Sequence, residues 1–127
     1  MLNVEMQLAS PEACSRIPPH LVPVAKAEVD FQGDRKQVRV TLKGVIEGES
    51  VNALRRFLKD VSSFRATKWI LQMENLQVLS GRGIQMLVKF SRIIRKRGHA
   101  VEIHGMHKNL YATLEELEVL KEFQIAD

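Results

Sequence analysis

The sequence predicts a single α/β domain built on one mixed β-sheet, and three observations predict it. Two segments that alternate apolar and polar residues, 24–31 and 38–42, have the pattern of paired antiparallel strands. From residue 50 onward, segments with helical periodicity alternate with short apolar segments, as helices and parallel strands do. The length of 127 residues suits one domain with a substantial core. The predicted order is β-β-α-β-α-β-α, with an antiparallel hairpin at the sheet edge and right-handed crossovers after it.

Residues 1–23 are predicted to form an N-terminal arm, and residues 24–127 the domain itself. Val4, Met6 and Leu8 alternate with polar residues, which favours a short strand that covers a sheet edge. Beyond it, prolines at 11, 18, 19 and 23 interrupt any regular element. Cys14 is the single cysteine, so an internal disulfide is excluded and a reducing cytoplasm is favoured.

The hairpin and the first helix follow from residue 24. In the two strands the apolar residues are separated by single polar ones, and the turn between them is predicted at Gly33-Asp34-Arg35. Gly44 is expected to end the second strand. Ser50 is expected to cap a helix whose apolar stripe is spaced three and four residues apart, and Ser62 and Ser63 to end it. The stripe consists of Val51, Leu54, Leu58 and Val61.

The second half of the chain predicts two further strands and two further helices. Trp69–Met73 is a short apolar run typical of a buried parallel strand. A loop then leads to a long helix that runs to about Arg97 and stops at Gly98. Residues 100–104 predict the next strand. The spacing of Leu110, Leu114 and Leu117 predicts the last helix, and residues 120–125 a closing segment.

The start of the long helix is the predicted functional site. A helix N-terminus leaves backbone N–H groups unpaired and carries a partial positive charge. It suits an anion, a phosphorylated side chain or a carboxylate of a partner. The predicted partner-binding residues lie at this start and one turn further on. They are Ser80, Gly81, Arg82, Gly83 and Met86.

Each residue at this start has a structural and a functional interpretation. Ser80 is a favoured N-cap and, as the alternative, a phosphoacceptor. Gly81 and Gly83 suit a tight turn and close packing of helix on sheet, and no nucleotide-binding fingerprint accompanies them. Arg82 is either a solvated cation or a group that holds an acidic partner or an anion.

The chain resembles the STAS domain, a family named for sulfate transporters and anti-sigma factor antagonists. The family signature is an apolar strand with an Asp, a short loop, and Ile-Asp-Ser-Ser-Gly-Leu/Ile opening a long helix. Residues 70–87 are similar to that signature, 40–47 to the family's strand ending in Gly-x-Leu-Asp, and 114–125 to its closing helix. The resemblance covers about Val24 to Ile125. It implies helices packed mainly on one face of the sheet, and a partner that is an anti-sigma factor with an ATPase-fold kinase domain.

The departures from the signature concern the phosphorylation site. In the antagonists the first Ser of Asp-Ser-Ser-Gly accepts a phosphate, and Gly81 stands at that position. Ser80 replaces the preceding Asp, Arg82 the second Ser, and Gln72 the Asp of the strand. The resemblance therefore implies a domain without the phosphorylation switch. Shifting the alignment by one residue makes Ser80 the acceptor, at the expense of the register of Gly83 and Ile84.

Composition and the remaining motifs exclude several function classes. With 45% apolar and 27% charged residues the chain is an ordinary globular one, and no apolar run is long enough to cross a bilayer. The net charge of +4 is modest and the basic stripe of the long helix lacks interleaved aromatic residues, which disfavours nucleic-acid binding. His104 and His107 lack a third metal ligand at a sensible spacing. No nucleophile–base pair is recognisable, so we expect no catalysis, no cofactor and no metal.

The sequence thus predicts a cytoplasmic bacterial signalling module that regulates transcription through a protein partner. Two alternatives stay open. One is a sensor that binds an anion, nucleotide or lipid at Arg82 and the helix N-terminus. The other is a scaffold or homodimer that self-associates through the arm or through a second apolar line on the long helix, formed by Met86, Phe90 and Ile93.

Overall fold

The computed structural model describes residues 2–30 and 36–126. The strands are β1 (Leu2–Gln7), β2 (Val24–Asp30), β3 (Gln37–Ile46), β4 (Lys68–Gln72), β5 (Leu76–Leu79), β6 (Val101–His104) and β7 (Gln124–Ala126). The helices are α1 (Pro11–Ser15), α2 (Glu49–Val61), α3 (Gly81–Lys96) and α4 (Lys108–Glu116), with short 3₁₀ turns at Pro19–Leu21 (η1) and Leu120–Glu122 (η2). The turn predicted at Gly33–Arg35 lies outside the described residues.

One mixed sheet organises the domain, as the sequence predicts. Its strand order is β1-β2-β3-β4-β6-β7, and the short β5 pairs with the end of β3. The pairs β1–β2 and β2–β3 are antiparallel, and all later pairs are parallel. The predicted order of two strands and then alternating helices and strands is present, with β5 and β7 as additional strands. The short edge strand favoured around Val4 and Met6 is present as β1.

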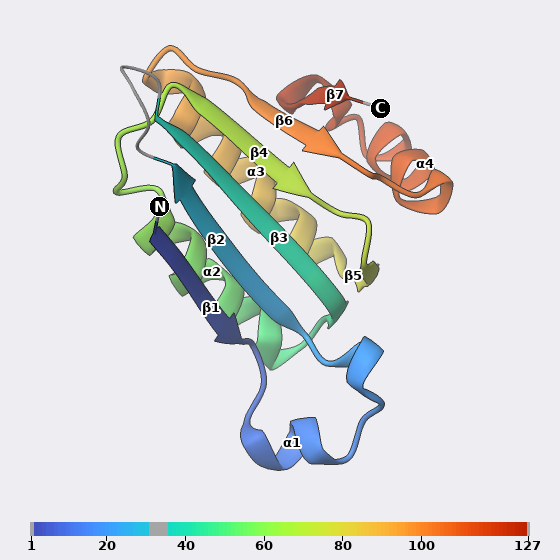
Figure 1. Cartoon of the computed structure of the whole chain (residues 1–127). Helices are drawn as coiled ribbons and strands as arrows, with labels where there is room; N and C mark the ends of the chain where they lie inside the picture. Colours follow the sequence, from blue (N-terminus) through green and yellow to red (C-terminus); the bar gives the residue numbers. More distant parts are fainter. Residues whose placement is uncertain (1, 31–35, 127) are drawn as a thin grey trace.

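The long helices lie on one face of this sheet. Figure 1 shows α2 and α3 side by side behind the strands, and the core fills the space between the two layers. Trp69 of β4 contacts Phe90 of α3 edge to face, with ring centroids 5.7 Å apart, and anchors the longer helix over the centre of the sheet. The expected packing of helices mainly on one face is confirmed.

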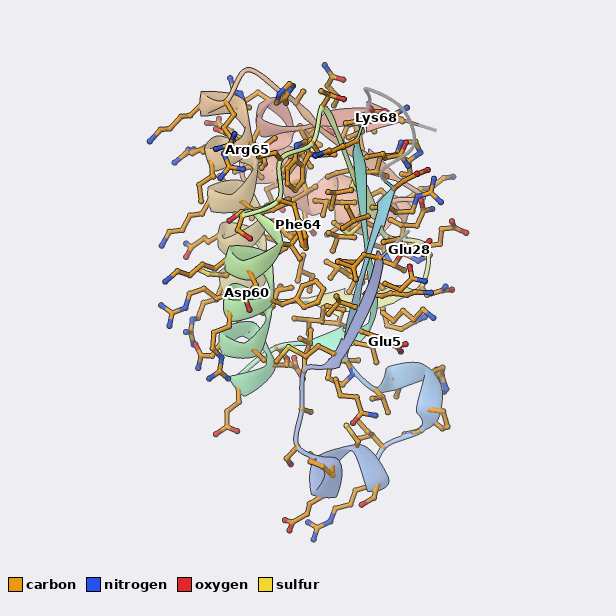
Figure 2. The ribbon with its side chains drawn as sticks, turned by 60° about the vertical axis from the view of Figure 1, so that its left-hand side comes forward. Glu5, Glu28, Asp60, Phe64, Arg65 and Lys68 are labelled. Atoms are coloured by element: carbon orange, nitrogen blue, oxygen red, sulfur yellow. The ribbon has the colours of Figure 1, made fainter. Side chains whose placement is uncertain are left out.

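The other face of the sheet carries mostly polar side chains. Glu5 and Glu28 project from the sheet away from α2 and α3, whereas Asp60 lies on α2 (Figure 2). Glu28 pairs in register with Arg39, so opposite charges face each other across β2 and β3. The alternating burial of β2 and β3 reflects this division between a buried and a solvated face.

The N-terminal segment completes the sheet edge and then crosses the end of β3. Strand β1 pairs along its whole length with β2, Leu8 after it is buried, and the residues of α1 are not. Gly44 has φ +80°, and a Cβ there would lie 2.2 Å from the carbonyl oxygen of Val22. The segment therefore passes so close to β3 that only glycine fits at this crossing.

Three local expectations are wrong. Gly44 does not end the second strand, because β3 continues to Ile46. Ser50 is not the N-cap of α2; Gly48 is, and the Ser50 hydroxyl donates to the Glu47 carbonyl oxygen at 2.6 Å from inside the first turn. The segment expected as a loop before α3 contains β5, which pairs with β3 beyond a register shift at Gly44/Val45. Gly98, with φ +88°, ends α3 where predicted.

Candidate docking surface at the start of α3

The start of α3 is held in place by the strands beside it. Strand β5 leads directly into Ser80, whose backbone N–H donates to the carbonyl oxygen of Ile46 at 3.0 Å. Ile46 is the last residue of β3. The helix start is therefore fixed to the carboxyl end of a central strand, which is where α/β sheets commonly position functional groups.

Ser80 caps the helix. Its backbone is extended and its hydroxyl oxygen accepts a hydrogen bond from the N–H of Gly83 at 3.2 Å, as predicted for an N-cap. The N–H groups of Gly81 and Arg82 have no acceptor among the residues that the structure describes. Both residues are exposed, so these two donors face solvent at the positive end of the helix.

Gly81 and Gly83 differ in their surroundings. A Cβ at Gly81 would meet no atom within 4 Å, whereas one at Gly83 would lie 2.5 Å from Cδ1 of Leu79. Both belong to the first turn of α3 and neither has a positive φ, so the tight turn expected of them is wrong. The close packing expected of them is confirmed for Gly83 alone, and Gly81 leaves open space at the surface.

Arg82 joins the two long helices. Its guanidinium donates to Oδ1 of Asn52 at 3.3 Å, from α3 to α2. Met86, one turn further along α3, is half-buried and packs against the core. We call the five residues Ser80, Gly81, Arg82, Gly83 and Met86 the docking surface.

Other residues that the sequence singled out do not join this surface. Gln72 ends β4, and its amide donates to the carboxylate of Glu74. His104 lies 3.3 Å from Oε1 of Glu102, and His107 lies 3.0 Å from the carbonyl oxygen of Glu74. In the described part of the chain, no three His, Cys, Asp or Glu residues are placed to share a metal ion.

Part of the basic stripe on α3 is structural. Glu122 of η2 is only 7% exposed and binds Arg92 and Arg95 of α3 at 3.2 and 3.0 Å. The hydrogen bond from Arg92 holds the pKa of Glu122 below its usual value; the charges of both arginines act in the same direction, and burial opposes them. Arg97 donates to the Ser62 carbonyl oxygen at the end of α2. These three arginines thus fasten neighbouring elements to α3.

Sequence reasoning missed the part of this region that α2 contributes. Asn52 is thirty positions from Arg82 and carries no motif, and Glu122 is similarly distant from Arg92. The helical periodicity does indicate that Arg55 and Lys59 face away from the core, but only the packing of α2 beside α3 shows which residues they approach.

Comparisons with known proteins agree with this architecture. A protein-family model described as "Mlab, STAS domain" matches residues 29–121. The structure of the Bacillus cell fate determinant SpoIIAA in its phosphorylated form superposes with a TM-score of 0.59 at 13% sequence identity, over 80% of this chain and 91% of that chain. At that identity the likeness concerns the fold alone. A search of curated proteins finds no match.

The fold class is therefore that of a mixed-sheet α/β domain whose long helices pack on one face, with an exposed helix start at the end of the central strands. Because the family model covers most of the chain, the protein belongs to the STAS family. Within residues 2–30 and 36–126, no helix is both long and apolar enough to span a membrane.

Proposed function

We propose that this STAS domain is a regulatory module that docks a protein partner on the docking surface, in the manner of an anti-sigma factor antagonist. The observation that supports it is the exposed, open first turn of α3, where Gly81 and Arg82 present two N–H groups and a guanidinium to solvent. A carboxylate of a partner suits that arrangement. Among the described residues, no His, Asp or Glu side chain is hydrogen-bonded to the Ser80 hydroxyl, which favours binding over catalysis.

The proposal includes the loss of the phosphorylation switch. In antagonists of the family, a phosphate at the first Ser of the signature blocks docking through its charge and bulk. Gly81 stands at that position and has no hydroxyl, while Ser80 is engaged as the N-cap. Binding is then constitutive, or governed by the state of the partner. The partner we propose is an anti-sigma factor with an ATPase-fold kinase domain in a bacterial cytoplasm.

The test is capture of such candidate partners by the purified full chain. Arg82→Glu should lower capture, because it replaces a cation with a carboxylate that repels the carboxylate of the partner. Lys43→Glu is the matched control, because Lys43 is also exposed and lies on the opposite face of the sheet. Equal capture by the wild type and both variants would show that the partner docks elsewhere.

The alternative function is a sensor that holds a small anion at the same helix start. The guanidinium of Arg82, which also donates to Asn52, and the free N–H groups of the first turn suit phosphate or sulfate as well as a carboxylate. Thermal shift measurements with phosphate and sulfate separate the two. A shift that disappears in Arg82→Ala would support the sensor, and no shift with either anion would leave protein docking as the function.

A further inference from the structure

A second surface lies between α2 and α3, on the side of these helices that faces away from the sheet. It is a groove of about 270 Å³. Its floor is apolar and consists of Leu58, Met86, Phe90 and Ile93, and its rim is basic and consists of Arg55, Lys59 and Lys89. We call this feature the α2–α3 groove.

The apolar line that the sequence places on the long helix is divided between core and surface here. Phe90 is buried against Trp69, as a core residue is. Ile93, one turn away, is 42% exposed and is one of the large exposed hydrophobic side chains of the molecule. Met86 is half-buried. The groove therefore continues the core outward to solvent between the two helices, which leaves apolar area that a partner can cover.

The rim has one sign of charge. The side chains of Arg55, Lys59 and Lys89 have no ion pair or hydrogen bond within the described part of the chain, and no carboxylate lines the groove there. Elsewhere on α3, by contrast, Arg92 and Arg95 are paired with Glu122. The cations beside the groove are thus available to an acidic ligand, and the charge around an apolar floor determines which ligand fits.

We propose that the α2–α3 groove binds an acidic amphipathic helix of a protein partner. Met86 and Ile93 are seven residues apart on α3, which is about 10 Å or two helical turns. An amphipathic helix places apolar side chains at this spacing along one face and fills such a groove with them. Acidic residues beside that face then meet Lys59 on one side of the groove and Lys89 on the other.

Charge and shape disfavour two other occupants. Face-to-face pairing of two copies would bring the same three cations of each rim together, at a cost in repulsion. An anionic membrane surface is flat, whereas the apolar residues here line a concavity that a protruding ridge of side chains fills. A partner helix satisfies both the charge and the concavity.

This inference rests on the proposed function and adds a second contact to it. Met86 belongs both to the docking surface and to the groove, so one partner can cover the two surfaces together. The groove would then carry part of the affinity through apolar burial, and the start of α3 would add polar recognition.

The probe for the test is a synthetic helical peptide of about 16 residues, with Leu at heptad spacing and Glu beside the Leu face. It is titrated into the isotopically labelled full chain and followed by NMR. We expect shifts concentrated in the facing residues of α2 and α3. A peptide with Lys in place of every Glu should bind at least about tenfold more weakly, because its charge repels the rim.

Charge exchange provides the matched variants. The double variant Lys59→Glu/Lys89→Glu should lose at least about tenfold in affinity for the Glu peptide and gain affinity for the Lys peptide. Lys43→Glu/Lys68→Glu makes the same change in net charge with exposed lysines of β3 and β4, outside the groove, and should bind as the wild type does. Absence of shifts in α2 and α3, or equal binding of both peptides by the wild type, would overturn the inference.

Two further readouts address the other occupants and the link to the proposed function. Sedimentation that shows a dimer dissociated by Ile93→Gln, or flotation with phosphatidylglycerol vesicles that Lys59→Glu/Lys89→Glu abolishes, would overturn the inference. Arg82→Glu should leave peptide binding within about twofold, since Arg82 lies outside the groove. If Arg82→Glu abolishes partner capture while the groove variants bind the peptide no differently from wild type, the inference fails and the proposed function stands.

Discussion

Gly81 and Gly83, two positions apart in the first turn of α3, should respond in opposite ways to replacement by alanine. At Gly81 the added methyl meets no atom within 4 Å. Alanine restricts the unfolded chain more than glycine does, so Gly81→Ala should stabilise the protein by about 0.4–1 kcal/mol. The gain comes from the unfolded state and requires no new contact in the folded one.

At Gly83 a steric clash in the folded state outweighs the same entropic gain. The Cβ would lie 2.5 Å from Cδ1 and 3.2 Å from Cγ of Leu79, so the leucine side chain must leave its position. Overpacking of this kind costs about 1–3 kcal/mol. After the entropic gain of about 0.4–1 kcal/mol is subtracted, Gly83→Ala should destabilise the protein by up to about 2.6 kcal/mol.

Urea unfolding of the wild type and both variants, followed by circular dichroism, measures the two changes side by side. We expect the midpoints to rank Gly81→Ala, wild type and Gly83→Ala, from highest to lowest. A Gly81→Ala variant less stable than the wild type would refute the open environment that underlies the docking surface. Equal stabilities of the two variants would refute the contact between Gly83 and Leu79.

Three further predictions concern contacts that fasten other segments of the chain to β3 and α3. Because the pKa of Glu122 is lowered in the folded state, its ionised carboxylate stabilises the fold. This stability is fully present above the usual carboxyl pKa of 4.5 and is lost as the pH falls through the pKa that Glu122 has in the folded protein. Glu122→Gln should therefore flatten the acidic limb of a plot of stability against pH, and an unchanged limb would contradict the role of its arginine partners. Gly44→Ala combines a positive φ with a methyl 2.2 Å from the Val22 carbonyl oxygen, so it should cost about 1–3 kcal/mol and speed proteolysis within residues 8–23. Unaltered proteolysis would contradict the close crossing at Gly44. Arg97→Ala should destabilise the protein by about 1 kcal/mol through the loss of its hydrogen bond to the Ser62 carbonyl oxygen, which thermal unfolding measures; an unchanged midpoint would contradict it.

Features that depend on local periodicity could be predicted from the sequence. The alternation in β2 and β3 and the helical spacing in α2 and α3 each reflect one buried face, so the elements follow from their residues. The cap at Ser80 and the stop at Gly98 are similarly local. Strand β5 carries no such signal, because two of its four residues are exposed and it pairs only with the end of β3.

The parts of the site that the sequence did not reveal depend on packing between distant segments. The cap of α2 requires a positive φ at Gly48, a preference that glycine permits but does not impose. The contact of Arg82 with Asn52 and the basic rim of the α2–α3 groove exist only because two helices lie side by side. Periodicity identifies the exposed side of each helix. Only the packing of α2 beside α3 shows that these sides form a contact and a groove.

The most direct test of the central claim is intact-mass measurement of the full chain after incubation with a captured ATPase-fold partner and ATP. We predict that the wild type binds the partner and keeps its mass. Gly81→Ser, which places a hydroxyl in open space at the family's phosphoacceptor position, should gain one phosphate. A phosphate on Ser80 of the wild type, located by fragmentation, would contradict the account, because it would show a working switch at the start of α3.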